Sequence, residues 1–213
     1  MARFDLVIFD CDGVVVDSER IVHAVFGAFI RSLGAHLSDA EMFERFLGLR
    51  LAECLGVVEG ITGQPVPPGA LDRYRTDRDR VLREQVQPVE GVREVLEGLT
   101  IPYCIASSGD LDKMRVTLGA TKLLPLFDGR FYSATEVPRG KPAPDVFLLA
   151  AQRMGAAPAR CVVIEDSVNG VLAGRAAGMT VFGFAGLTAP AKLIDAGAAL
   201  VLSHMRELPA LLG

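Results

Sequence analysis

Short apolar runs recur along this chain with helical patterns between them, and this alternation constrains the fold more than any other feature. The runs occupy residues 4–9, 103–106, 161–164, 180–184 and 199–202, with a weaker candidate at 130–133. The helical patterns occupy residues 92–99, 111–118, 144–154, 168–177 and 190–196. Strands that alternate with helices are typical of a parallel sheet covered on both faces. We therefore predict an α/β fold built on a doubly wound parallel sheet.

The segment between the first two apolar runs breaks this alternation and contains no convincing strand. An apolar stripe at helical spacing runs from Ile21 to Leu33, and further helical stretches follow it. We therefore predict a core domain of residues 1–16 and 87–213, with an all-helical cap domain inserted at residues 17–86.

Composition excludes several classes of function. Half of the 213 residues are hydrophobic and the net charge is −4, so the chain can bury a large core and lacks the basic surface of a nucleic-acid binder. No apolar run could cross a membrane and the first residues lack a signal-peptide pattern, so a cytoplasmic location is the default expectation. The four cysteines show no metal-binding spacing, and we expect them to be buried. We expect His23, His36 and His204 to be structural or surface residues.

Polar side chains gather where the predicted strands end. The clusters are Asp10–Gly13, Ser107–Gly109 and Glu165–Ser167, and a fourth, Gly140–Asp145, opens a helix after the weak strand. In an open parallel sheet, ligands bind at the carboxyl ends of the strands. We therefore expect these clusters to converge on one site.

The chemistry of these clusters is coherent. Four carboxylates could share one site only if a cation neutralised them, and Mg²⁺ prefers such all-oxygen sites. They belong to Asp10, Asp12, Glu165 and Asp166. The charge of Lys141 and the hydroxyl of Ser107 suit phosphate oxygens, and a carboxylate can act as the nucleophile that receives a phosphoryl group. These residues therefore predict a Mg²⁺-dependent phosphotransfer site.

Four motifs in order make the chain resemble the haloacid dehalogenase superfamily, in particular its β-phosphoglucomutase-like phosphatases with a helical cap. The matching residues are Asp10-Cys-Asp12-Gly-Val-Val-Val-Asp17-Ser18, Ser107, Gly140-Lys141-Pro142 and Glu165-Asp166-Ser167-Val-Asn169-Gly170. A single acidic pair would be a weak signal, but four motifs that each follow a predicted strand are a specific one. The resemblance covers nearly the whole chain, and it implies a Rossmann-like core and an aspartyl-phosphate intermediate.

The resemblance also implies roles. Asp10 would be the nucleophile and a metal ligand, and Asp12 would be the general acid–base whose backbone carbonyl also binds the metal. Asp166 would ligate Mg²⁺, with Glu165 ligating it directly or through water.

Ser107 and Lys141 would bind the phosphoryl group, although Ser107 could instead be, or also be, a helix N-cap. We expect Ser18 and Ser167 to cap helices, and Asn169 to orient loops rather than to take part in catalysis.

Two arginines of the predicted cap are candidates for contact with the substrate. Five arginines lie between residues 73 and 83, and most of them belong to a solvated helix face. Arg78 differs, because at helical spacing it shares a face with Tyr74 and Leu82, and a charge on an apolar face needs a partner. Arg50 lies near the loop that faces the substrate in the family.

Several functions compete for this pattern, and a phosphatase fits best. A dehalogenase lacks the second aspartate, and a response-regulator receiver domain is smaller and has no cap. A β-phosphoglucomutase-like sugar-phosphate mutase is the alternative. However, mutases of this branch place a histidine where Val22 stands, with His23 one residue on, and a Lys-Asn pair where Asp110 and Leu111 stand.

The expected partner is a phosphorylated small molecule, a sugar phosphate or sugar-acid phosphate by family analogy. We expect no nucleic-acid or membrane partner. The oligomeric state is open, with a monomer as the default.

Overall fold

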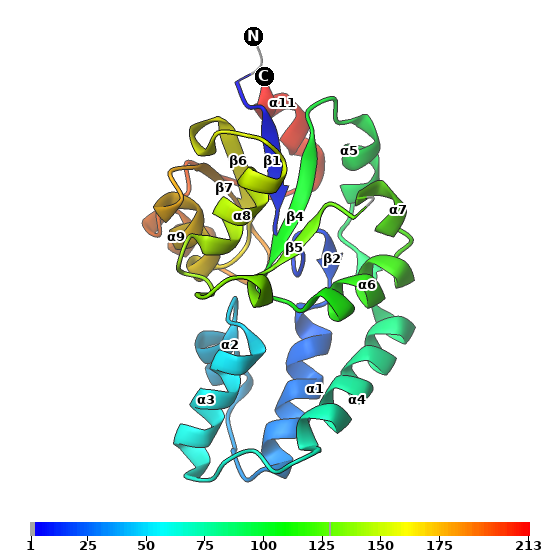
Figure 1. The fold of residues 1–213 in the computed structure, drawn as a ribbon, viewed down its shortest axis with the longest axis vertical. Helices are drawn as coiled ribbons and strands as arrows, with labels where there is room; N and C mark the ends of the chain where they lie inside the picture. Colours follow the sequence, from blue (N-terminus) through cyan, green and yellow to red (C-terminus); the bar gives the residue numbers. More distant parts are fainter. Residues whose placement is uncertain (1–2, 128) are drawn as a thin grey trace.

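The computed structural model describes residues 3–127 and 129–213, and a six-stranded sheet forms its centre (Figure 1). The strands are β1 (Leu6–Phe9), β4 (Tyr103–Ser107), β5 (Phe131–Ser133), β6 (Cys161–Glu165), β7 (Thr180–Phe184) and β8 (Leu200–Leu202). They lie in the order β5-β4-β1-β6-β7-β8, and every neighbouring pair is parallel. This confirms the predicted α/β parallel sheet, with the weak candidate strand at its edge.

Helices cover both faces of this sheet because its central strands are apolar on both sides. Leu6 and Ile8 of β1 belong to one hydrophobic cluster and Val7 and Phe9 to another, so alternate residues point to opposite faces. The helices on the first face are α8 (Asp145–Arg153), α9 (Val168–Ala176) and α10 (Pro190–Asp195). Those on the second are α5 (Val92–Gly98), α6 (Leu111–Ala120), α7 (Leu124–Phe127) and α11 (Leu208–Leu212). Short 3-10 turns lie at Ala134–Glu136, Pro158–Arg160 and Met205–Glu207.

The strand order reverses at β1, which lies between β4 and β6. In doubly wound sheets such a reversal opens a crevice at the carboxyl ends of the strands, and ligands bind there. Figure 1 shows that these ends point toward the helices of the inserted segment.

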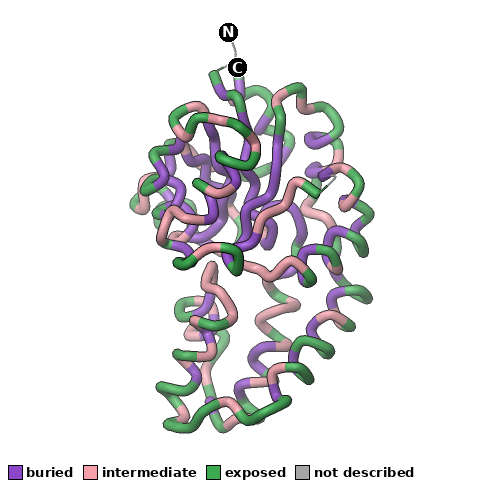
Figure 2. The backbone as a smooth tube through the Cα atoms, viewed as in Figure 1, coloured by how far each residue is buried: buried purple, intermediate pink, exposed green. Residues whose placement is uncertain are grey.

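The inserted segment folds as four helices with a core of their own. They are α1 (Glu19–Ser32), α2 (Asp39–Phe46), α3 (Leu51–Thr62) and α4 (Ala70–Gln85). Phe26, Phe46 and Tyr74 are buried among them, and Figure 2 shows buried stretches along these helices between exposed ones. A ribbon of two short antiparallel strands, β2 (Val16–Asp17) and β3 (Gln87–Pro88), joins these helices to the sheet.

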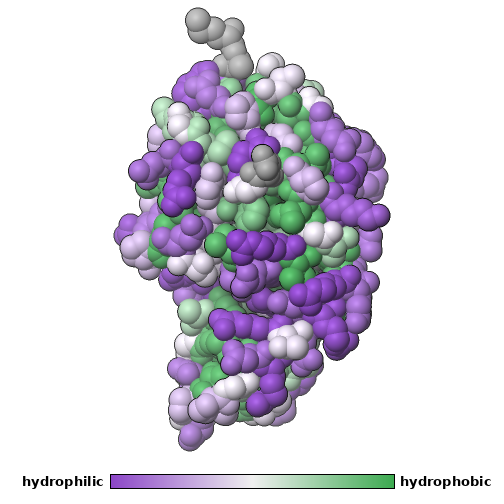
Figure 3. All heavy atoms as spheres, turned by 45° about the vertical axis from the view of Figure 1, so that its right-hand side comes forward, coloured by the Kyte–Doolittle hydropathy of each residue, from purple (hydrophilic) through white to green (hydrophobic). Residues whose placement is uncertain are grey.

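The surface is mixed in polarity. Figure 3 shows hydrophilic side chains spread over both the helical part and the sheet part on the face that it displays. Among the described helices, none combines the length and the apolar character that crossing a membrane would require.

Candidate active site

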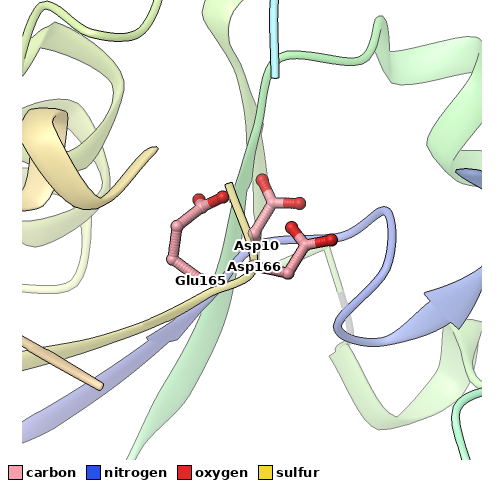
Figure 4. Close-up of side chains that lie close together, drawn as sticks. All are labelled: Asp10, Glu165 and Asp166. Carbon is pink, nitrogen blue, oxygen red and sulfur yellow. The ribbon is translucent and has the colours of Figure 1, made fainter. Parts of the chain in front are cut away.

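Three buried carboxylates meet at the ends of β1 and β6. Asp10 directly follows β1, Glu165 ends β6, and Asp166 is the next residue. One carboxylate oxygen from each lies within 4.8 Å of the other two, and Figure 4 shows the three groups gathered at this edge. Since β1 and β6 are parallel neighbours, their carboxyl ends lie at the same edge of the sheet. Three of the four predicted metal-ligating residues therefore bring their carboxylates together.

This acidic cluster fits a divalent cation. Oδ2 of Asp166 is buried and has no hydrogen-bond partner among the described residues, and a bound cation would satisfy it. Gly13 has a φ of +78°, and a Cβ there would lie 2.1 Å from that oxygen, so only glycine leaves it room. Burial, reinforced by the charge of Glu165, raises the pKa of Asp166 well above its usual value. An all-oxygen donor set of this kind suits a hard cation.

Lys141 supplies the positive charge of the site. Its ammonium group donates a hydrogen bond to Oδ1 of Asp10 and lies 2.8 Å from Oε2 of Glu165, and the side chain is almost fully buried. Burial alone would lower the pKa of Lys141, but the two carboxylates raise it above its usual value. For Asp10, burial raises the pKa well above its usual value, and Lys141 opposes this only in part. The predicted phosphate-binding lysine is thus in contact with the predicted nucleophile.

Ser107 ends β4 at the same edge and is buried. Its Oγ accepts a hydrogen bond from the backbone N–H of Gly109 at 3.0 Å. The alternative role of Ser107 as a helix N-cap does not hold, because Asp110 occupies the N-cap of α6 and accepts from the N–H of Lys113. Ser107 lines a cavity of about 400 Å³ together with the acidic cluster.

The carboxylate of Asp12 is not part of the acidic cluster and has partners of its own. Its Oδ1 lies 2.7 Å from Nζ of Lys113 and also accepts a hydrogen bond from the hydroxyl of Ser18. Burial would raise the pKa of Asp12, but Lys113 and Ser18 lower it. Ser18 stands at the N-cap of α1, but its side chain makes no capping hydrogen bond, so the expected capping role is wrong. Its hydroxyl donates to Asp12 instead.

Sequence reasoning missed Lys113. It lies in the first turn of α6, is only 8% exposed and lines the cavity. The available signal was its place in the first turn of a helix that begins at the carboxyl edge of the sheet.

The two candidate arginines of the inserted helices both line the cavity, and both have partners. Nη1 of Arg78 lies 3.0 Å from Oδ2 of Asp110, and Nε lies 2.8 Å from Asp79. Arg78 is buried, so its charge needs a partner, and Asp110 at the N-cap of α6 is that partner. Nη2 of Arg50 lies 2.8 Å from Oε1 of Glu53.

The loop that carries Arg50 rests on the sheet part of the molecule. The Ser108 hydroxyl donates to the carbonyl of Gly48 at 2.8 Å, and the Asn169 amide donates to the carbonyl of Leu47 at 3.2 Å. Asn169 therefore contacts a loop as expected, while Ser167 accepts from the N–H of Gly170 as the N-cap of α9.

One of the three histidines that were expected to be structural or surface residues also lines the cavity. His23 lines the cavity, with its ring stacked on Phe43 at a centroid distance of 4.1 Å and its Nε2 3.4 Å from Glu19. Val22 lies in the same cavity wall. The other two histidines, His36 and His204, are exposed, and all four cysteines are buried as expected.

A doubly wound sheet that gathers carboxylates, a lysine and a serine beneath a helical insert defines a phosphotransfer hydrolase. The family model of haloacid dehalogenase-like hydrolases matches residues 4–178, and this chain belongs to that family.

Relatives and solved structures agree with this assignment. The 6-phosphogluconate phosphatase of Escherichia coli is 32% identical and aligns over 86% of this chain and 84% of its own length. Hexitol phosphatase B of E. coli is 31% identical over 81% of this chain and 79% of its own length. The crystal structure of a HAD family hydrolase from Deinococcus radiodurans with bound phosphate and sodium is 36% identical, covers 100% of this chain and 96% of its own, and gives a TM-score of 0.76. The prediction that the chain is a phosphatase is confirmed.

Proposed function

We propose that this phosphatase requires Mg²⁺, forms an aspartyl-phosphate on Asp10 and hydrolyses a phosphorylated sugar or sugar acid. The observation that carries the proposal is the position of Asp10, whose carboxylate belongs to the acidic cluster and accepts a hydrogen bond from Lys141. The two named relatives act on sugar-acid and hexitol phosphates, which supports the substrate class.

Asp10, Glu165 and Asp166 would hold the metal, together with the backbone carbonyl of Asp12. When bound, Mg²⁺ would neutralise charge on the phosphoryl oxygens and on the cluster. Lys141 and Ser107 would bind the remaining phosphoryl oxygens. The bound phosphate in the D. radiodurans relative supports a phosphate site on this fold.

The chemistry then has two steps. Asp10 attacks phosphorus, the bond to the leaving oxygen breaks, and Asp12 gives that oxygen its proton. Water next attacks the phosphorus of the aspartyl-phosphate and gives its proton to Asp12, while the electron pair of the broken bond returns to Asp10. General acid–base catalysis of this kind contributes about 10²–10⁴-fold.

The inserted helices would form a cap of residues 17–86 that closes over the site and excludes bulk water. The paired strands β2 and β3 support hinges at these boundaries, because the chain enters the inserted helices directly after β2 and leaves them directly before β3. The hydrogen bonds that the loop around Gly48 accepts from the sheet part support a closed arrangement.

A mutase remains the second candidate, and one argument against it is corrected by the structure. Asp110 stands where the mutases have a lysine, so it places a negative charge where a second phosphate would need a positive one, but Arg78 neutralises that charge. The other argument is weakened, because His23 lines the cavity beside Val22, although its ring stacks on Phe43 and its Nε2 lies 3.4 Å from Glu19. Hydrolysis remains the proposed outcome, because both named relatives are phosphatases.

The test is release of phosphate from a panel of hexose, hexitol and sugar-acid phosphates, with Mg²⁺ or with excess chelator. We expect turnover only with the metal, and no turnover by Asp10→Asn, which keeps the shape but lacks the nucleophile. Full activity in chelator would contradict the metal assignment, and normal turnover by Asp10→Asn would contradict covalent catalysis. With β-glucose 1-phosphate and a trace of the 1,6-bisphosphate, glucose 6-phosphate that forms much faster than phosphate would establish the mutase.

A further inference from the structure

The surroundings of Asp12 assign different tasks to its two carboxylate oxygens. Both recorded donors, the ammonium of Lys113 and the hydroxyl of Ser18, bind Oδ1. Among the described residues, no hydrogen bond reaches Oδ2. That oxygen lies near Ser107 and beside the stem of Lys113, because a Cβ on Gly109 would be 3.4 Å from both Oδ2 and the Ser107 Oγ and 3.5 Å from Cδ of Lys113. The oxygen on the phosphate-binding side is thus the one left open.

Lys113 is itself held in place. Its backbone N–H donates to Oδ1 of Asp110 at 2.8 Å, and its carbonyl accepts from the Thr117 hydroxyl at 3.2 Å. The same Asp110 forms the ion pair with Arg78 of α4. Lys113 therefore projects from a helix start that is fixed by its own N-cap and by the inserted helices.

We infer that Lys113 is a positioning residue, which holds Oδ1 of Asp12 so that Oδ2 takes the proton from the water that hydrolyses the aspartyl-phosphate. This inference rests on the proposed function. In the step concerned, the water oxygen bonds to phosphorus as the bond to Asp10 breaks, its electron pair returns to Asp10, and the water proton goes to Oδ2 of Asp12. A base displaced by about 1 Å costs on the order of 10²-fold in rate.

The test separates this second step from the first by using p-nitrophenyl phosphate. Nitrophenolate leaves as a stable anion, so the first step needs little help from Asp12. The parameter kcat/KM reports the steps up to nitrophenolate release, whereas kcat also includes hydrolysis of the aspartyl-phosphate. We compare Lys113→Met with the native protein and with Lys192→Met, which removes an exposed lysine on α10.

We expect Lys113→Met to lower kcat by about 100-fold while changing kcat/KM only slightly. Rapid mixing should then show a burst of nitrophenolate equal to the enzyme concentration, and acid quenching should trap the aspartyl-phosphate. Ser18→Ala, which removes only a hydroxyl, should show the same split to a smaller extent, and it keeps the test decisive if Lys113→Met folds poorly. Lys192→Met should match the native protein.

Equal losses in kcat and kcat/KM without a burst would overturn the inference, because they would indicate a role in substrate binding or in folding. Unchanged kcat in both variants would overturn it too. The proposed function fails separately, if acid quenching of the native protein and of Asp12→Asn yields no phosphate bound to Asp10.

Discussion

Nη1 of Arg78 on α4 lies 3.0 Å from Oδ2 of Asp110, the residue that caps α6. This ion pair joins the inserted helices to the sheet part of the molecule. The Arg78 side chain is 4% exposed and that of Asp110 is 29% exposed, so water screens the pair less than it screens a surface pair. Removal of either partner leaves the other in a partly desolvated place.

The effects of Arg78→Met and Asp110→Asn on stability should therefore not add. Each single variant should lower the free energy of unfolding, and the double variant should be less unstable than the sum predicts by about 1–3 kcal/mol. Urea unfolding of the four proteins measures this coupling. A matched cycle on Arg115 and Asp112, an exposed pair on α6 at 2.9 Å, should give a coupling near zero. Additive losses at Arg78 and Asp110 would contradict the ion pair.

The same pair should make stability depend on pH. Burial would raise the pKa of Asp110, but Arg78 and the N–H of Lys113 lower it below its usual value of 3.8. A carboxyl with a lowered pKa in the folded state stabilises the protein above its unfolded pKa and loses this contribution as pH falls through the folded value. The stability gap between the native protein and Asp110→Asn should thus be constant near neutral pH and shrink below about pH 4. A gap that stays constant down to pH 2 would contradict this origin.

Arg78 should also affect the substrate, because it lines the cavity. We expect Arg78→Ala to raise KM for the preferred substrate by more than its loss of stability explains, since it perturbs the wall that faces the leaving group. The check is to measure KM at a temperature well below the Tm of the variant. An unchanged KM with a lower Tm would show that Arg78 acts only on folding.

Asp166 offers a test of the metal that does not need turnover. Its raised pKa means that, without a cation, the ionised carboxylate destabilises the folded protein at neutral pH. Asp166→Asn should raise the Tm in chelator and should abolish most of the increase that Mg²⁺ gives the native protein. Asp195→Asn, at an exposed position on α10, should leave both values unchanged. A native Tm that does not respond to Mg²⁺ would contradict the proposed site.

Sequence periodicity predicted the sheet because its strands are apolar on both faces, a pattern that few other arrangements share. The meeting of Asp10 with Asp166 was also predictable, since both follow strands and parallel strands end at one edge. The ribbon of β2 and β3 was not, because each strand has two residues and Pro88 carries no N–H. The ion pair of Asp12 with Lys113 could not be predicted either. Only the side-chain rotamer of Asp12 decides whether its carboxylate meets Lys113 or the acidic cluster, and these groups lie far apart in the sequence. The place of His23 in the cavity wall was not predicted either, because it depends on how the inserted helices lie over the sheet.

Arg50 provides a test of how the cavity selects its substrate. Arg50 lines the cavity, but Glu53 holds its guanidinium through Nε at 3.0 Å and Nη2 at 2.8 Å, and Nη1 donates to the carbonyls of Ala134 and Val137, so its charge is already neutralised. Glu53 also accepts from the backbone N–H of Arg50 at 3.0 Å, a bond that glutamine can keep.

Glu53→Gln should therefore release the charge of Arg50 without removing the start of α3, and the freed guanidinium should favour a leaving group that carries a carboxylate. The matched substrates are a hexitol 6-phosphate and 6-phosphogluconate, which share a six-carbon chain and differ in the carboxylate. We expect the ratio of kcat/KM for the sugar acid over the hexitol to rise by about 10-fold, because a charge-assisted hydrogen bond in a partly buried site contributes roughly 1.5 kcal/mol. Glu59→Gln, on the same helix but outside the cavity wall, is the control and should leave the ratio unchanged. An unchanged ratio in Glu53→Gln, with Tm intact, would show that Arg50 does not reach the leaving group.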